Sequence, residues 1–207
     1  MARNSNRRTD MRARIAAAAA RLMAEDGIDD FALAKRKAAR QLGTSETQSL
    51  PRNDEIEAEL RAYRALYQAD EHPQLINELR RIALDAMRAL ERFSPYLTGP
   101  VLKGIASPYA EIELQLFPDS TKDVEIFLLD QNIAFSTQEG RRYSGDQSRA
   151  VSLISLLWQG APVRLAILDP RDERLSLKTS VAGRAIERAG ITEVSAILSR
   201  RPADKLA

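Results

Sequence analysis

The sequence predicts an α+β fold in which about four N-terminal helices precede a small mixed sheet. Apolar residues recur at helical spacing up to about residue 93. After Pro95 they alternate with polar residues instead, which is the pattern of strands. The length of 207 residues accommodates one domain, or a compact domain with a small helical appendage. We therefore expect a disordered basic tail over residues 1–9, a helical region over residues 10–93 and an α+β domain over residues 94–207.

The first two predicted helices are bounded by common capping residues. The first should start near Asp10 and stop at Gly27, because glycine readily ends a helix. Asp29 or Asp30 can accept hydrogen bonds from the free N–H groups at the start of the second, which should run to about residue 42. The second helix carries four basic residues and no acidic one: Lys35, Arg36, Lys37 and Arg40.

The third and fourth predicted helices follow a polar loop over residues 44–51. Asn53 or Asp54 can cap the third helix, and Pro73 suits the first turn of the fourth. Both helices carry a broad apolar stripe at helical spacing. We expect these stripes to pack within the chain, and a homodimer through the same helices is a further hypothesis.

The second half of the chain predicts several strands. Residues 96–98, 111–117, 151–158 and 163–168 have the apolar or alternating pattern of strands, and residues 133–137 are a further candidate. Residues 139–146 and 159–162 contain glycines between these segments, which predicts a loop and a turn. Asp119 or Ser120 can cap a helix between the strands, and Thr192 can cap a C-terminal one.

Composition and charge exclude some kinds of site and suggest others. The chain has no cysteine, so disulfides and cysteine-bound zinc are excluded, and its single histidine argues against a Ser-His-Asp triad. No apolar run reaches the length of a membrane span, so we expect no membrane partner and a cytoplasmic location. Arg7 and Arg8 lie in a strongly basic N-terminal segment. Together with the basic residues of the second helix, they are candidates for contacts with nucleic acid phosphates.

The opening helices resemble those of tetracycline-repressor-type transcription regulators. Residues 12–43 give a basic residue, an alanine-rich helix, a glycine and a second helix in the order seen in that family. The resemblance implies a recognition helix after Gly43 that enters the major groove of DNA. Pro51 falls where that helix should continue, which argues against a complete DNA reader. A DNA-binding regulator is therefore one alternative function.

The central segment resembles the polymerase-beta-type nucleotidyltransferases, especially the small bacterial ones. Their signature is L-F-G-S-x-A-R-G-x-A, three residues, then S-D-I-D-L. In this chain residues 97–106 are LTGPVLKGIA and residues 110–114 are AEIEL, in the same register without a gap. The positions that match are Gly99, Gly104, Ala106, Ile112 and Leu114, and Lys103 keeps a positive charge where the family often has arginine.

The resemblance implies a nucleotidyltransferase-like topology and a chemistry for this segment. Gly99, Lys103 and Gly104, which we call the phosphate cradle, would hold the triphosphate of a nucleoside triphosphate. Glu111 and Glu113, the carboxylate pair, would hold Mg²⁺ and serve as the catalytic residues, since residues at i and i+2 of a strand share a face. Both are aspartates in the family, and Mg²⁺ demands near-ideal octahedral geometry.

Two further departures from the family bear on catalysis. Pro100 stands where the family has serine, which removes a hydroxyl and a backbone donor from the cradle. The third carboxylate implied by the resemblance belongs on a strand such as residues 163–168, where the chain has Arg164. Arg164 could pair with Glu111 or Glu113 in place of the metal. Alternatively, Glu111, Glu113 and Gln115 would simply form the solvent face of an edge strand.

The whole chain is also similar to a group of proteobacterial proteins of about this length. Shared segments are AKRKAA at residues 34–39, LPRNDEIE at residues 50–57 and the turn at residues 99–104. Members of that group are commonly labelled nucleotidyltransferase or UDP-N-acetylmuramate–alanine ligase. Such a ligase needs a G-x-x-x-x-G-K-[ST] phosphate loop, which this sequence lacks.

Two function hypotheses from different classes follow. In the favoured one, the chain is a divergent nucleotidyltransferase-like protein with weak or lost catalysis that acts as a nucleotide-binding or regulatory module. In the alternative, it is an active Mg²⁺-dependent nucleotidyltransferase. The sequence leaves the nucleotide and the acceptor unidentified under either hypothesis.

Overall fold

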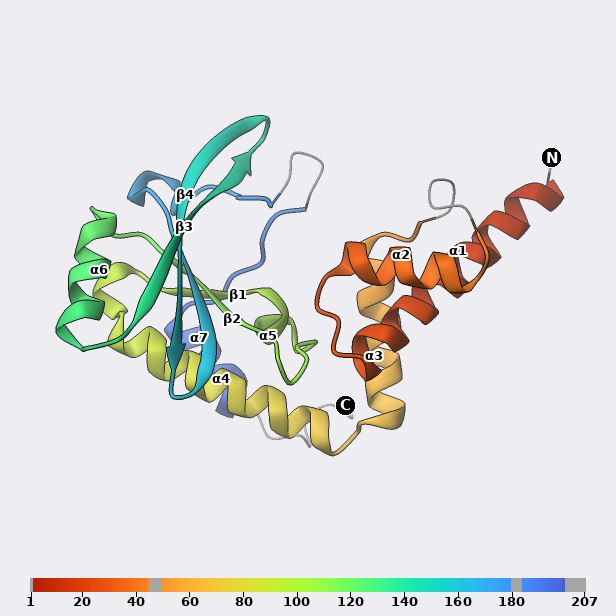
Figure 1. Cartoon of the computed structure of the whole chain (residues 1–207), viewed down its shortest axis with the longest axis horizontal. Helices are drawn as coiled ribbons and strands as arrows, with labels where there is room; N and C mark the ends of the chain where they lie inside the picture. The colour runs from red at the N-terminus through yellow and green to blue at the C-terminus, as the bar shows by residue number, and fades with distance from the viewer. Residues whose placement is uncertain (1, 45–49, 180–183, 200–207) are drawn as a thin grey trace. The chain divides into compact units, whose positions relative to one another are not determined.

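The computed structural model describes residues 2–44, 50–179 and 184–199 of the chain. Over these residues it contains seven α-helices and one five-stranded mixed sheet, with the N-terminal helices preceding the strands (Figure 1). This confirms the α+β class that the sequence predicts. No helix in the described part of the chain is both long and apolar enough to cross a lipid bilayer.

The chain divides into two compact units. The helical unit comprises the described residues of Met1–Leu75 together with Ile105–Ala110, and the sheet unit comprises those of Ile76–Gly104 and Glu111–Ala207. The division falls within a helix, α4 (Glu71–Ala89), and not after residue 93 where the change of apolar spacing placed it. Local spacing marks where helices give way to strands, but it does not reveal which neighbours a helix packs against.

Three helices form most of the helical unit: α1 (Ala2–Glu25), α2 (Phe31–Gln41) and α3 (Asn53–Tyr67). Asp30 caps α2 as expected, since its side chain accepts hydrogen bonds from the N–H groups of Ala32 and Leu33. The N-cap of α3 is Arg52, and neither Asn53 nor Asp54 takes that position. The helix α1 begins at Ala2, so it includes residues of the tail that we expected to be disordered.

The core of the helical unit is built from small residues on two helices. Both α2 and α3 pack against α1. Fully buried alanines at these contacts let the helix axes approach closely, and larger side chains from α3 fill the remaining space. The buried residues at these contacts include Ala16, Ala19 and Ala20 of α1, Ala34, Ala38 and Ala39 of α2, and Ile56 and Leu60 of α3.

The sheet unit contains the rest of α4 and the five strands in the order β1-β2-β5-β4-β3. Only β2 and β5 run parallel, and every other neighbouring pair is antiparallel. The strands are β1 (Tyr96–Thr98), β2 (Ile112–Leu116), β3 (Phe135–Ser144), β4 (Gln147–Trp158) and β5 (Ala161–Ile167). The remaining elements are α5 (Gly99–Lys103), α6 (Thr121–Asp130), capped by Ser120, α7 (Ile191–Ser199), and the 3-10 helices η1 (Glu91–Phe93) and η2 (Pro170–Asp172).

The β3–β4 hairpin differs from the sequence prediction. Residues 139–144, expected to be part of a loop, extend β3 and pair with β4 down to Ser144 opposite Gln147 (Figure 1). This part of β3 has no apolar alternation, and its backbone hydrogen bonds to β4 hold it in place. The turn between β4 and β5 is also shorter than expected, because Ala161 and Pro162 belong to β5.

The pleat of the sheet separates an apolar face from a mixed one. Residues of β2 and β5 that lie opposite one another, such as Leu114 and Leu165, are fully buried on the first face. The second face carries Glu113 and Arg164 as opposed residues. Strand register also puts Arg142 of β3 on this second face. Arg142 pairs with Arg149 on β4, and Arg164 pairs with Ser155 on the same strand. Arg149 and Ser155 are an even number of residues apart, so they and their partners share a face.

Candidate functional site

The predicted nucleotide site lies in the sheet unit around β1, α5, β2 and β5 (Figure 1). Thr98 at the end of β1 pairs with Glu113 on β2, and Glu113 pairs in turn with Arg164 on β5. Glu111 comes directly before β2, and Gly99 directly after β1. The strand register thus brings the first cradle residue next to the carboxylate pair.

Gly99 has a backbone conformation that favours glycine, and a side chain lies close to it. Its φ is +69°, in the left-handed region that residues with a Cβ rarely adopt. A Cβ at this position would lie 2.7 Å from Cδ of Glu113 and within 3.0 Å of both carboxyl oxygens. The Glu113 carboxyl group therefore packs against the backbone of the cradle.

The other end of the cradle is held by a residue that sequence analysis did not single out. Arg80, from α4, donates from Nε to the carbonyl of Val101 at 3.1 Å and from Nη2 to the carbonyl of Leu102 at 2.7 Å. These carbonyls lie near the C-terminal end of α5, where intrahelical donors run out. Gly104 ends α5 with a φ of +69°. No sequence pattern signals the role of Arg80, because its partners are about twenty residues away on another element.

The carboxylate pair is matched by arginine side chains. Arg164 forms an ion pair with Glu111, which is one of the two pairings that the sequence left open. Burial raises the pKa of the Glu113 carboxyl above its ordinary value, while the charges of Arg164 and Arg142 act in the opposite direction. Arg142 and Arg164, which we call the arginine pair, therefore supply most of the positive charge beside the two glutamates.

Arg142 is the second residue that sequence analysis missed. Desolvation lowers the pKa of its guanidinium, against the effect of the nearby Glu113 charge. Its Nε is buried and makes no hydrogen bond to any residue that the structure describes, although Nη1 donates to the carbonyl of Arg141 at 3.0 Å. A buried donor without an acceptor is costly, so this atom is a place where an anionic ligand would be favourable.

Mg²⁺, which the family resemblance implies, does not fit these side chains as they stand. Glu111 already pairs with Arg164, and burial favours the neutral form of Glu113, whereas Mg²⁺ takes ionised oxygen ligands in near-octahedral geometry. Arg164 also occupies the place on β5 where a third carboxylate is implied. Among the residues that the structure describes, no three or more His, Cys, Asp or Glu side chains gather in a group that could hold a metal ion.

The interpretation of the glutamates as the solvent face of an edge strand is wrong. Strand β2 is internal, since it pairs with β1 on one side and with β5 on the other. Gln115, on the same face as Glu113, is only 3% exposed. Apolar alternation is the same for an internal and an edge strand when the second face is polar, so the sequence could not distinguish them.

At least two of the four basic residues of α2 have polar partners within the chain. Lys35 donates from Nζ to Oδ1 of Asn53 at 2.7 Å, and Nζ of Lys37 lies 3.7 Å from Oδ2 of Asp26. Arg36 and Arg40 are exposed on the same helix. The side chains of Arg7 and Arg8 lie outside the described part of the structure, as do residues 45–49 of the segment where a recognition helix was implied.

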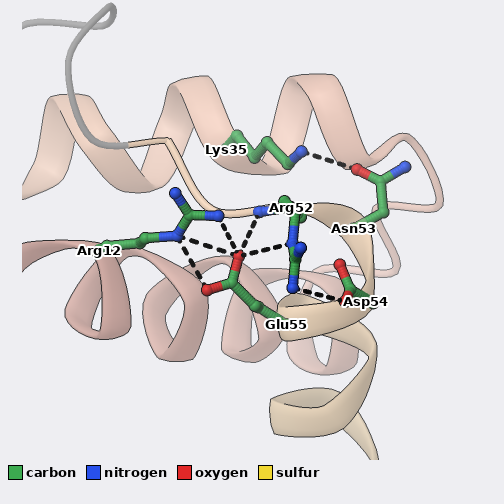
Figure 2. A network of polar contacts seen from close by, with 6 residues as sticks. All are labelled: Arg12, Lys35, Arg52, Asn53, Asp54 and Glu55. Carbon is green, nitrogen blue, oxygen red and sulfur yellow. Dashed lines mark hydrogen bonds and ion pairs between the residues drawn. The ribbon is translucent and has the colours of Figure 1, made fainter. Parts of the chain in front are cut away.

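A network of polar contacts holds further basic residues at the start of α3 (Figure 2). Arg12 of α1 donates from Nε to the two carboxyl oxygens of Glu55 at 2.8 and 3.0 Å. Glu55 also accepts the N–H of Arg52 at 2.7 Å. The hydrogen bond from Arg12 is the main cause that lowers the pKa of Glu55 to about 2. This network ties α1 to α3, and it gives these cations a structural role within the helical unit.

Comparison of the chain with protein-family models, with curated proteins and with solved structures finds no match. The functional interpretation of the site therefore depends on its own geometry.

Proposed function

We propose that the sheet unit is a divergent nucleotidyltransferase-like module that binds the phosphates of a nucleotide without Mg²⁺ and without nucleotide transfer. The observation that carries this proposal is the ion pair between Arg164 and Glu111. It puts a cation on β5 where metal-dependent transfer would need a carboxylate, and it neutralises one of the two glutamates intended for the metal.

The residues around the cradle support an anionic ligand. The arginine pair and Lys103 act on Glu113 with positive charge, so the five ionisable groups comprise three cations and two carboxylates. The orphaned Nε of Arg142 offers a buried donor that an oxygen of a phosphate could satisfy. Helix α5 spans only Gly99–Lys103 and includes Pro100, so its backbone N–H groups contribute little, and side-chain cations would carry most of the attraction.

The order of elements supports the nucleotidyltransferase-like assignment. A strand, a glycine turn, a short helix and a second strand with two acidic residues follow one another in β1, Gly99, α5 and β2. The parallel strand β5 lies beside β2, where the resemblance implies the third catalytic strand. Loss of the third carboxylate with retention of this order is what a module that binds but does not transfer would have.

Isothermal titration calorimetry tests the proposal. ATP, GTP, CTP and UTP are titrated into the full chain in EDTA and again in excess Mg²⁺. We expect micromolar binding of at least one nucleotide in EDTA, weakened about tenfold or more by Arg142→Met or Arg164→Met, because a hydrogen bond to a charged group contributes roughly 1.5–3 kcal/mol. Arg171→Met, which removes an exposed arginine of the same unit, is the matched control for net charge.

Two results would overturn the proposal. Binding that requires Mg²⁺ and disappears in a Glu111→Gln, Glu113→Gln double variant would establish the metal-dependent alternative instead. No binding of any nucleotide in either buffer would remove the nucleotide-binding function altogether.

A further inference from the structure

The segment between the phosphate cradle and the carboxylate pair belongs to the helical unit. Residues Ile105–Ala110 pack with the helical unit, whereas Gly104 before them and Glu111 after them belong to the sheet unit. Ile105 is buried in the core cluster that α1, α2 and α3 form. Ala106 and Ser107 are 0% and 1% exposed. We call this segment loop 105–110.

A buried arginine of α3 holds the middle of loop 105–110. Arg64 is 4% exposed and donates from Nη1 to the carbonyl of Ala106 at 2.9 Å. The same Nη1 lies 2.7 Å from Nε2 of His72, which is itself 3.1 Å from that carbonyl. Within the part of the chain that the structure describes, Arg64 thus contacts a backbone carbonyl and an imidazole.

This placement of a guanidinium is energetically expensive. Desolvation lowers the pKa of Arg64 to about 10, and the charge of Asp29 acts against it. Its Nε is also buried and has no hydrogen-bond partner among the described residues. A leucine or methionine would fill the same space without these costs. The function of a charged group here must therefore lie in what it holds, and that is the Ala106 carbonyl.

A second contact fastens the same loop. Ser107 donates from Oγ to Oδ2 of Asp29 at 2.9 Å, in the connection between α1 and α2. Ser107 Oγ also accepts the N–H of Tyr109 at 3.3 Å, and the carbonyl of Ser107 accepts the N–H of Ala110 at 3.2 Å. The loop is therefore held by the helical unit at two successive residues and by its own turn.

We propose that Arg64 is a positioning residue for nucleotide binding, because it fixes loop 105–110, whose two ends are Gly104 of the cradle and Glu111 of the carboxylate pair. The inference rests on the proposed nucleotide-binding function. Release of the loop gives more conformational freedom to residues 105–110 and to Gly104 and Glu111, which are joined to its ends. Each freed backbone residue then has to be ordered again when a phosphate binds, which weakens affinity.

The test combines hydrogen–deuterium exchange of the full chain with ATP titration. Arg64→Lys keeps a positive charge but replaces the planar guanidinium, whose Nη1 contacts Ala106 and His72, by a compact ammonium group. We expect about tenfold faster exchange in residues 105–110, faster exchange in residues 99–104, and an ATP Kd raised about tenfold. Arg61→Lys, one turn away on α3 and 51% exposed in its side chain, should change none of the three.

The outcomes separate this inference from the proposed function. If loop 105–110 exchanges faster while residues 99–104 and the ATP affinity stay unchanged, the loop is fastened without any effect on the cradle, and the inference is refuted. Unchanged exchange in the loop itself refutes it as well. If the wild-type chain binds no nucleotide, the proposed function fails and the inference fails with it, and exchange in residues 99–104 then shows only whether Arg64 fixes the cradle. Ser107→Ala gives the same readouts should Arg64→Lys not fold.

Discussion

Replacing Gly99 by alanine tests the central contact of the candidate site, the packing of the Glu113 carboxyl on the cradle. Two separate costs follow from the structure. The φ of +69° places alanine in the left-handed region, which costs about 1–2 kcal/mol. The new Cβ would also lie 2.7 Å from Cδ of Glu113, and relief of such an overlap costs roughly 1–3 kcal/mol. We expect Gly99→Ala to lower the free energy of unfolding of the sheet unit by about 2–5 kcal/mol.

A matched glycine separates the two costs. Gly145 has a φ of +57°, and a Cβ there would meet nothing within 4 Å. Gly145→Ala should therefore cost only the conformational part, about 1–2 kcal/mol. In a Glu113→Ala background, the cost of Gly99→Ala should fall to the same value, because the carboxyl group that the new Cβ would contact is absent.

Urea unfolding followed by the fluorescence of Trp158 measures these differences. It is the single tryptophan of the chain and lies on β4, so it reports on the sheet unit. The double-mutant cycle gives the coupling between positions 99 and 113 directly. Equal costs for Gly99→Ala and Gly145→Ala, or the same cost with and without Glu113, would refute the packing of Glu113 against the cradle.

Three further predictions concern both units. Arg164→Asp should gain micromolar-to-millimolar Mn²⁺ binding, seen by electron paramagnetic resonance, because it frees Glu111 and adds a third carboxylate; Arg164→Met binding Mn²⁺ equally well would contradict the role of the added carboxylate. The pKa of Glu55 is lower in the folded chain than its ordinary value of 4.5, so ionised Glu55 stabilises the helical unit at pH values above about 4.5. This stability is lost as the pH falls toward the folded pKa of about 2. Glu55→Gln should therefore cost about 1 kcal/mol at pH 7, after allowance for solvent screening, and nothing near pH 2, as measured by urea unfolding with circular dichroism; an equal cost at both pH values would exclude the ion pair as its cause. Leu60→Ala, at a fully buried position, should destabilise the helical unit by about 2–5 kcal/mol in the same assay, and a cost below 1 kcal/mol would contradict its place in the core.

Sequence analysis was most successful where a single local signal decides the structure. Asp30 caps α2 because its short side chain reaches the free N–H groups two and three residues on. Strand β2 follows from the alternation of Ile112, Leu114 and Leu116, which are all buried on one face. Both signals act within a few residues, so no knowledge of distant neighbours is needed.

The residues that complete the candidate site depend on distant neighbours instead. Arg142 lies on a strand that the sequence predicted as a loop, and only pairing with β4 puts it on the face of Glu113. Arg80 reaches the carbonyls of α5 from another helix. The pairing of Arg164 depends on a distant neighbour as well. The sequence showed its charge but did not decide between Glu111 and Glu113 as its partner.

The sequence by itself determined the α+β class and the order of the helices and strands. These features follow from spacing, capping and alternation, which are local properties of the chain. The family resemblance implied the grouping of Gly99 with the two glutamates. Only the tertiary structure decided that α4 is shared between two units, that Arg164 pairs with Glu111, and that Arg64 is buried against loop 105–110. Each of these depends on which segments meet, because desolvation and ion pairing act between residues that are far apart in sequence.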